Sequence, residues 1–105
     1  EQELYCTKKE ILYVESRKRK VDIHTLGECF TVYATMRYME EQLGGDFYRC
    51  HRGYLVNMAY VKEYETDVIH LKNGETVYIA RDKYSEFAKA YMRFLKEGET
   101  PMCRF

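Results

Sequence analysis

The stretch VDIHTLGECFTV, Val21–Val32, decides the fold class, because apolar and polar side chains alternate along most of it. Alternation with a period of two is the pattern of β-strands that bury one face. Gly27-Glu28, near the middle, suits a two-residue type II′ turn. This turn predicts the pairs Leu26 with Cys29, Thr25 with Phe30, and Ile23 with Val32. We therefore expect a β-hairpin with Ile23, Phe30 and Val32 on one face and His24 and Thr31 on the other.

Strand-like segments continue on both sides of this hairpin. Ile11–Glu15 is almost wholly apolar, which indicates a strand buried on both faces near the centre of a sheet. Ser16–Lys20 is polar throughout and is expected to be a loop, and His51–Asn57 is expected to be a connection with an apolar centre. Aromatic and β-branched residues predict further strands over Leu4–Lys8, Phe47–Cys50, Tyr60–Thr66 and Val68–Lys72.

A second hairpin is expected at Asn73-Gly74, the residue pair that two-residue turns favour most. Such a turn places Lys72 opposite Glu75, an attractive contact between opposite charges. The remaining predicted pairs are Leu71 with Thr76, Ile69 with Tyr78, and Val68 with Ile79.

Two helices complete the predicted elements. Thr35 suits an N-cap, Met36, Met39 and Leu43 follow at helical spacing, and Gly44-Gly45 ends this short middle helix. Asp82 is expected to cap a C-terminal helix that ends at Gly98 and Pro101. Its apolar stripe is expected to be Tyr84, Phe87, Ala88, Tyr91 and Leu95.

The order of these elements contains no β-α-β units, so it predicts a mainly β fold, compact and antiparallel, with small sheets and two helices. The 105 residues allow one domain, residues 1–105, and the 46% of hydrophobic residues excludes a disordered chain. No apolar run approaches the roughly 20 residues that span a bilayer, and no signal peptide is visible. We therefore expect no membrane partner and a cytoplasmic location. The start at Glu1 rather than Met suggests a piece of a longer protein.

Enzymatic chemistry is not indicated. The sequence contains none of the common nucleophile, metalloprotease or phosphate-loop motifs. Cys50 and His51 are neighbours, so in a strand their side chains point to opposite faces. The cysteines show no spacing typical of a zinc site, and we expect free thiols, no metal, no cofactor and no catalytic residue. The four cysteines are Cys6, Cys29, Cys50 and Cys103.

Charge points to a different function once it is examined locally. Basic and acidic residues number 17 each, a balance that by itself argues against a nucleic-acid partner. However, cations gather at Arg17–Lys20, within Phe47–Asn57 and at Arg81–Lys83. We expect a basic face, whose loops suit phosphates and guanine edges, and an acidic back. The acids assigned to that back are Glu40, Glu41, Asp46, Glu63, Glu65, Asp67, Glu97 and Glu99.

Four ordered blocks of the sequence resemble the LytTR DNA-binding domain: Ile11–Ser16, Phe47–Asn57, Ile69–Glu75 and Ile79–Arg81. The pattern Phe-x-Arg-x-His-Arg-x-Tyr-x-Val-Asn within the second block is the family's most distinctive one, and the similarity spans about residues 4–96. Gly53 and Ala80 depart from it, because the family commonly has Ser at both positions. The resemblance implies the output domain of a bacterial response regulator of a two-component system, which regulates transcription and usually follows a receiver domain.

The resemblance also implies how DNA would be bound. Loops of such a domain enter successive major grooves of double-stranded DNA, and paired domains, a possible homodimer on DNA, occupy direct repeats. Carried over, Arg19 would be the main base contact of the first loop, Arg52 would follow His51 in the second, and Arg81 would begin the third. Lys20, Arg49 and Tyr78 would contact phosphates. The full expected set is Arg17, Lys18, Arg19, Lys20, Arg49, His51, Arg52, Tyr78, Arg81 and Lys83.

Alternatives remain open from the sequence. The His51 ring could instead tie the strand end to a backbone carbonyl, and Asn57 is expected to cap a turn. Exposed tyrosines on a sheet would also suit single-stranded DNA or RNA. A protein-interaction module would pair the basic loops with acids of a partner or of this chain.

Overall fold

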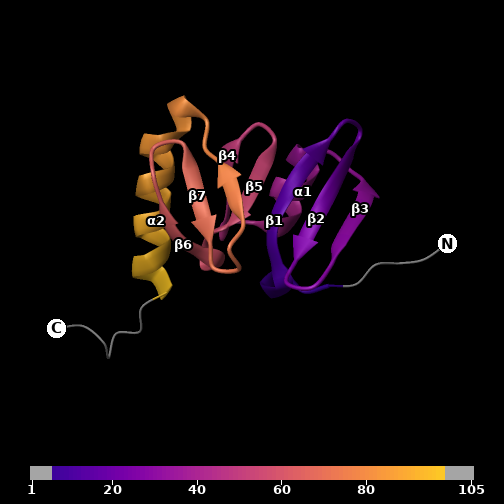
Figure 1. The fold of residues 1–105 in the computed structure, drawn as a ribbon, viewed down its shortest axis with the longest axis horizontal. Helices are drawn as coiled ribbons and strands as arrows, with labels where there is room; N and C mark the ends of the chain where they lie inside the picture. Colours follow the sequence, from indigo (N-terminus) through magenta and orange to yellow (C-terminus); the bar gives the residue numbers. More distant parts are fainter. Residues whose placement is uncertain (1–5, 99–105) are drawn as a thin grey trace.

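The computed structural model describes residues 6–98 and shows two antiparallel sheets, each with a helix packed beside it (Figure 1). The five-stranded sheet has the order β3-β2-β1-β5-β4, and the three-stranded sheet has the order β6-β7-β8. The expected mainly β fold with a middle helix and a C-terminal helix is confirmed. The strands are β1 (Ile11–Arg17), β2 (Lys20–Thr25), β3 (Cys29–Tyr33), β4 (Phe47–His51), β5 (Tyr54–Asn57), β6 (Val61–Tyr64), β7 (Val68–Leu71) and β8 (Thr76–Tyr78). The helices are α1 (Met36–Leu43) and α2 (Tyr84–Gly98), and 3₁₀ turns cover Lys8–Glu10, Met58–Tyr60 and Arg81–Lys83.

β1 lies at the centre of the larger sheet, as its apolar sequence predicts, and its first four residues are buried. The pairing of β1 with β2 contains a bulge between Ile11 and Tyr13. Because of this bulge, neighbouring side chains of β1 point into two different hydrophobic cores. Ile11 and Val14 pack beneath α1, whereas Leu12 and Tyr13 enter the core between the two sheets and α2. None of the helices within residues 6–98 is long and apolar enough to cross a bilayer.

α1 forms as predicted. The Thr35 hydroxyl accepts a hydrogen bond of 3.0 Å from the backbone N–H of Tyr38, which satisfies a free donor of the first turn. Met36, Met39 and Leu43 are buried, and Gly44 ends the helix with φ of 82°.

α2 buries a different stripe from the one that we expect. Phe87 is fully buried and contacts the rings of Tyr48, Tyr64 and Tyr91. Phe94 continues this row, whereas Leu95 is 42% exposed. Tyr84, Phe87, Tyr91 and Phe94 follow one another at intervals of three, four and three residues, which places them on one side of the helix. Asp82 is not the N-cap of α2, because it lies inside the preceding 3₁₀ turn.

The β2–β3 turn is shifted by one residue from its predicted place. Thr25 and Glu28 close it through a backbone bond of 2.8 Å, and the Thr25 hydroxyl binds the Glu28 backbone in addition. Ile23 therefore pairs with Phe30, and His24 with Cys29. A turn shift of one residue moves the partners by two, so each side chain keeps its expected face and the predicted alternation is confirmed.

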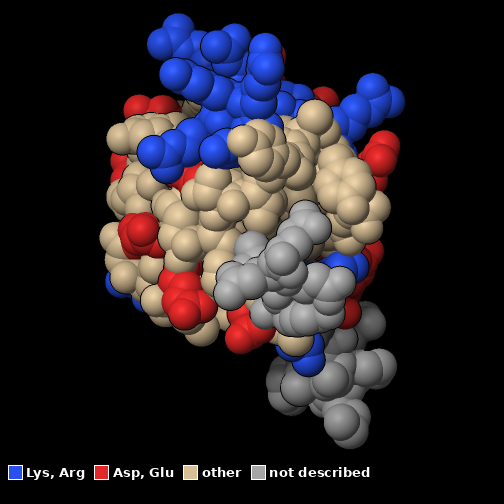
Figure 2. All heavy atoms as spheres, turned by 90° about the vertical axis from the view of Figure 1, so that its right-hand side faces the viewer, with Lys and Arg blue, Asp and Glu red and all other residues tan. Residues whose placement is uncertain are grey.

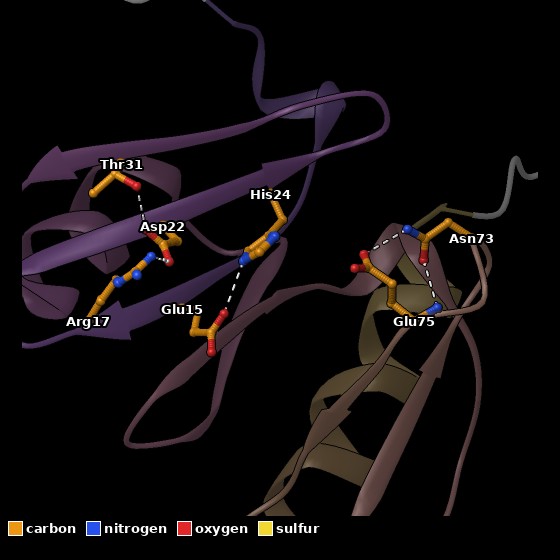
Figure 3. Close-up of polar contacts among 7 residues, drawn as sticks. All are labelled: Glu15, Arg17, Asp22, His24, Thr31, Asn73 and Glu75. Carbon is orange, nitrogen blue, oxygen red and sulfur yellow. Dashed lines mark hydrogen bonds and ion pairs between the residues drawn. The ribbon is translucent and has the colours of Figure 1, made fainter.

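The observed β7–β8 register also differs from the predicted one, in this case by one residue. Gly74 has φ of 95°, and the Leu71 N–H bonds to the Glu75 carbonyl at 2.8 Å, so three residues rather than two form the turn. The predicted contact between Lys72 and Glu75 is wrong, since the Glu75 carboxylate accepts a bond from the Asn73 amide (Figure 3). The observed pairs are Val68 with Tyr78, Ile69 with Val77, and His70 with Thr76.

Three segment predictions need correction. The expected connection His51–Asn57 contains β5, which lies between β1 and β4 and is mostly buried. Its last residue, Asn57, binds the Ile11 carbonyl and caps the following turn, as expected of it. The expected loop Ser16–Lys20 is mostly strand, which leaves Lys18-Arg19 as the turn. In the segment Leu4–Lys8, residues 4 and 5 lie outside the described range, and Cys6–Lys8 form no strand.

Candidate nucleic-acid interface

Three basic segments that are distant in sequence reach the same edge of the molecule. They are the β1–β2 turn at Lys18-Arg19, the β4–β5 turn at Arg52-Gly53, and the Arg81–Lys83 turn before α2. All three lie along the upper side of Figure 1. Figure 2, turned by 90°, shows Lys and Arg side chains crowded at this same side. We call this surface the basic edge.

The first segment is a tight hairpin rather than a loop. Arg17 pairs with Lys20 across it, and Lys18 has φ of 57°, an uncommon conformation for a residue with a side chain. Lys18 and Arg19 are exposed at its tip. The Lys20 ammonium lies 4.7 Å from the ring centre of Tyr33, a cation–π contact on the edge strand. These residues line a surface hollow of 640 Å³.

Asp22 fixes the base of this hairpin (Figure 3). It is buried and accepts bonds of 2.7 Å from the Thr31 hydroxyl and 3.1 Å from the Arg17 guanidinium. These bonds, that of Thr31 first, hold the pKa of the Asp22 carboxyl below its ordinary value although burial opposes them. Arg17 is thus turned toward the sheet, which leaves Lys18 and Arg19 as the outermost cations of this segment.

Asp22→Asn is expected to lower the free energy of unfolding at neutral pH by about 1–2 kcal/mol, because both bonds lose a charged acceptor. The folded chain has the lower pKa, so the ionised carboxyl stabilises the fold above pH about 4, and this stabilisation disappears as the pH falls through the folded value. Urea unfolding at neutral and at stepwise lower pH measures the difference between the two proteins. A difference that stays constant as the pH falls would contradict this role.

The second segment is held by side-chain bonds to its backbone. The Gly53 N–H donates to Nδ1 of His51 at 3.0 Å, and the Gly53 carbonyl accepts from the N–H of Ser16. The Arg49 guanidinium donates to the Arg52 carbonyl at 2.7 Å and to Glu40 at 3.1 Å. His51 therefore binds a backbone N–H, not the carbonyl that its alternative role supposes. Arg49 supports the turn whose exposed side chain is Arg52.

The expected separation into a basic face and an acidic back is wrong for Glu40. It is expected on an acidic back, yet it pairs with Arg49 beside the basic edge, because the end of α1 packs against β4. Glu40, Arg49, His51, Arg52 and Lys83 line one hollow of 510 Å³, together with Ala80 and Asp82. The acidic β6–β7 turn also points upward in Figure 1, beside α2. The basic edge is thus bordered by acids.

The third segment is joined directly to the second. The Ala80 N–H donates to the Cys50 carbonyl at 2.7 Å, and the Lys83 N–H donates to the Ala80 carbonyl. Arg81 is exposed and Lys83 is half-buried. Tyr78 is 54% exposed, and its ring centre lies 6.1 Å from that of Tyr54. The Tyr54 ring in turn packs edge-on against the His51 ring. These aromatic contacts connect β8 to the β4–β5 turn.

The outermost arginines are not neutralised by neighbouring acids. Within residues 6–98, no ion pair involves Arg19, Arg52 or Arg81, whereas Arg17 and Arg49 each bind a carboxylate. The ten predicted residues lie on these three turns and the strand ends beside them, and among their arginines Arg19, Arg52 and Arg81 are exposed without an ion pair in the described part of the chain, whereas Arg17 and Arg49 each bind a carboxylate. The contacts of Asp22, Tyr33 and Glu40 could not be predicted from the sequence, because they depend on strand register and helix packing.

The three described cysteines differ in their surroundings. Burial raises the pKa of the Cys50 thiol to about 12, which leaves it protonated and unreactive. Cys6 and Cys29 are exposed free thiols. One cluster, Asp22, His24 and Cys29, has the donor atoms to hold a metal ion.

Known proteins are similar to this chain in sequence and in fold. Over 87 residues the chain is 30% identical to the sensory transduction protein LytT of Bacillus subtilis (strain 168), covering 77% of this chain and 36% of that protein. The chain thus spans about a third of this curated relative. A solved structure, the LytTr DNA-binding domain of a Bacillus cereus protein described as a methyl-accepting/DNA response regulator, superposes with a TM-score of 0.72 at 20% identity. It covers 83% of this chain and 84% of that one, which shows the shared fold.

The family model of the LytTr DNA-binding domain matches residues 4–92, which include every strand and most of α2. A match of this extent shows that the chain belongs to the LytTr family of DNA-binding domains.

Proposed function

We propose that the basic edge binds double-stranded DNA with sequence preference, its three turns entering major grooves on one side of the duplex. The observation that carries this proposal is the position of Arg19, Arg52 and Arg81, exposed on turns of one edge and free of ion pairs within residues 6–98. An arginine that is not held by a carboxylate can form two parallel bonds to guanine O6 and N7. The rigid sheets beneath fix the spacing of the turns.

The supporting residues have a different proposed role. Lys18, Lys20 and Lys83 provide charge for phosphates, which binds any sequence. Arg17 and Arg49 position the turns through Asp22 and Glu40, and each keeps further N–H donors for a phosphate. His51, with Nδ1 occupied by the Gly53 N–H, offers its Nε2–H as a donor. Tyr78 offers its exposed hydroxyl.

Lys18→Ala is expected to weaken binding to the preferred site and to random duplex alike. The ammonium at the hairpin tip contributes charge without reading bases, so the slope of log K against log salt falls by about 0.9. Fluorescence anisotropy over a salt series measures both quantities. A loss confined to the preferred site would show instead that Lys18 reads sequence.

Selection from a random duplex library at a stated salt concentration tests the proposed function as a whole. We expect a short enriched motif that contains guanine, and weaker binding of the same sequence as a single strand. Recovery of no motif would contradict sequence preference, and preference for the single strand would favour the nucleic-acid alternative through exposed tyrosines. Binding of a protein partner that persists unchanged at high salt would favour an interaction module.

The proposal extends to the full-length protein that would contain this domain. We propose that this domain is the transcription-regulating output of a cytoplasmic response regulator with a receiver domain, and that two copies occupy direct repeats. The support is family membership and the likeness to a sensory transduction protein nearly three times as long as the matched region. An enriched motif that appears twice at a fixed spacing would support paired binding, and a lone half-site would contradict it.

A further inference from the structure

A cluster of three metal-binding side chains lies on the sheet face below the first hairpin. Donor atoms of Asp22, His24 and Cys29 all lie within 4.8 Å of one another. His24 and Cys29 are direct partners across β2 and β3, and Asp22 lies two residues before His24 on the same face. Imidazole, thiolate and carboxylate are the ligands that zinc-class ions take in proteins.

Two neighbours orient His24 as a ligand. Nε2 of His24 lies 3.0 Å from a Glu15 carboxylate oxygen (Figure 3). The ring also stacks on that of Tyr13, with ring centres 4.2 Å apart. A carboxylate bound to one ring nitrogen fixes the tautomer and the orientation of the ring. Histidine ligands of metal sites usually have such a partner.

The charges of the side chains around this cluster also favour a bound cation. Asp22 and Glu15 contribute two negative charges and Arg17 one positive charge, so a Cys29 thiolate would leave the group at minus two, which a divalent ion neutralises. Each Asp22 oxygen accepts one bond, from Thr31 or Arg17, and keeps a second lone pair. Partial burial and the charges of Asp22 and Glu15 raise the pKa of Cys29, so metal binding must release the thiol proton to solvent.

We propose that Asp22, His24 and Cys29 bind one divalent zinc-class ion, with Glu15 as the positioning residue and the fourth position open to water. The S–H bond of Cys29 breaks, its proton leaves to water, and a sulfur–metal bond forms. Bond lengths of about 2.0–2.3 Å place ligand atoms about 3–4 Å apart, so the cluster must close by about 1 Å. Rotation of the exposed Cys29 side chain can provide this movement. The site shares Asp22 with the first basic hairpin, but metal binding can be measured without DNA.

Titration of the full chain with Co²⁺ under reducing conditions tests the site, because a cobalt–thiolate bond gives a near-ultraviolet charge-transfer absorption. We expect this absorption to saturate at one ion per chain and to be abolished by equimolar Zn²⁺. Cys29→Ser should remove it, and Glu15→Gln should weaken Co²⁺ binding by about 10- to 100-fold. Cys6→Ser, at another exposed thiol, is the matched control and should leave it unchanged.

Three results would overturn the proposal. They are a wild-type chain with no absorption at saturating Co²⁺, an absorption that persists in Cys29→Ser, and one that Cys6→Ser removes. Circular dichroism of each variant confirms folding, and we expect folding to be retained because Cys29 and Cys6 are exposed. Loss of DNA binding in a separate assay would leave these results unaffected, so the two proposals fail independently.

Discussion

Arg52→Ala is expected to weaken binding to the preferred duplex by about 5- to 150-fold while changing binding to random duplex by only a few-fold. The fold-change corresponds to about 1–3 kcal/mol, the discrimination that one bidentate arginine–guanine pair provides. The side chain of Arg52 is exposed, and its backbone carbonyl is held by Arg49, so removing the side chain leaves the turn in place. Competition between the two duplexes at constant salt measures the ratio.

Arg52→Lys is the matched control for this experiment. Lysine keeps the charge but lacks the planar fork, so it should retain binding to random duplex and still lose most of the preference. Equal losses on both duplexes for Arg52→Ala would show that Arg52 only contacts phosphates. Lys62→Ala, an exposed cation on β6 in the other sheet, should change neither affinity appreciably.

The largest effect on stability is expected from Phe87→Ala, a loss of about 3–5 kcal/mol in the free energy of unfolding. Phe87 is fully buried and packs with Tyr48 of β4, Tyr64 of β6 and Tyr91 of α2. Removing its ring opens a cavity where the two sheets and α2 meet. A domain of this size is typically stable by only about 5–15 kcal/mol, so the variant should be close to unfolding at physiological temperature.

Urea unfolding measures this loss, and Met92→Ala is the matched control. Met92 lies on the same helix but is 53% exposed, so its removal should change stability by about 0.5 kcal/mol or less. If Phe87→Ala does not fold, Phe87→Leu keeps most of the apolar volume and should show a smaller, measurable loss. Similar values for Phe87→Ala and Met92→Ala would contradict the position of this core.

Local sequence signals predicted much of the fold because they act over short distances. The central place of β1 follows from its unbroken apolar residues, and the start of α1 follows from Thr35 and the spacing of its methionines. Both hairpins were also predicted. Their registers were not, because the Thr25 hydroxyl closes one turn and the left-handed Gly74 lengthens the other.

Register and packing decide the parts of the site that the sequence did not predict. His24 meets Cys29 only because the β2–β3 turn is displaced, and their separation along the chain resembles no common zinc motif. Arg49 and Arg52 belong to one basic segment in the sequence, yet packing of α1 on β4 gives Arg49 a carboxylate partner. A count of charges along the chain cannot distinguish the two arginines.

We propose that three separate basic turns form one DNA-binding edge. Backbone amide chemical shifts, followed during titration with the selected duplex, test this arrangement. We expect Lys18-Arg19, Arg52-Gly53 and Arg81–Lys83 to shift together with one midpoint, while amides of β6 stay unchanged. Shifts limited to one of these turns, or centred on β6 and the outer face of α2, would contradict the claim.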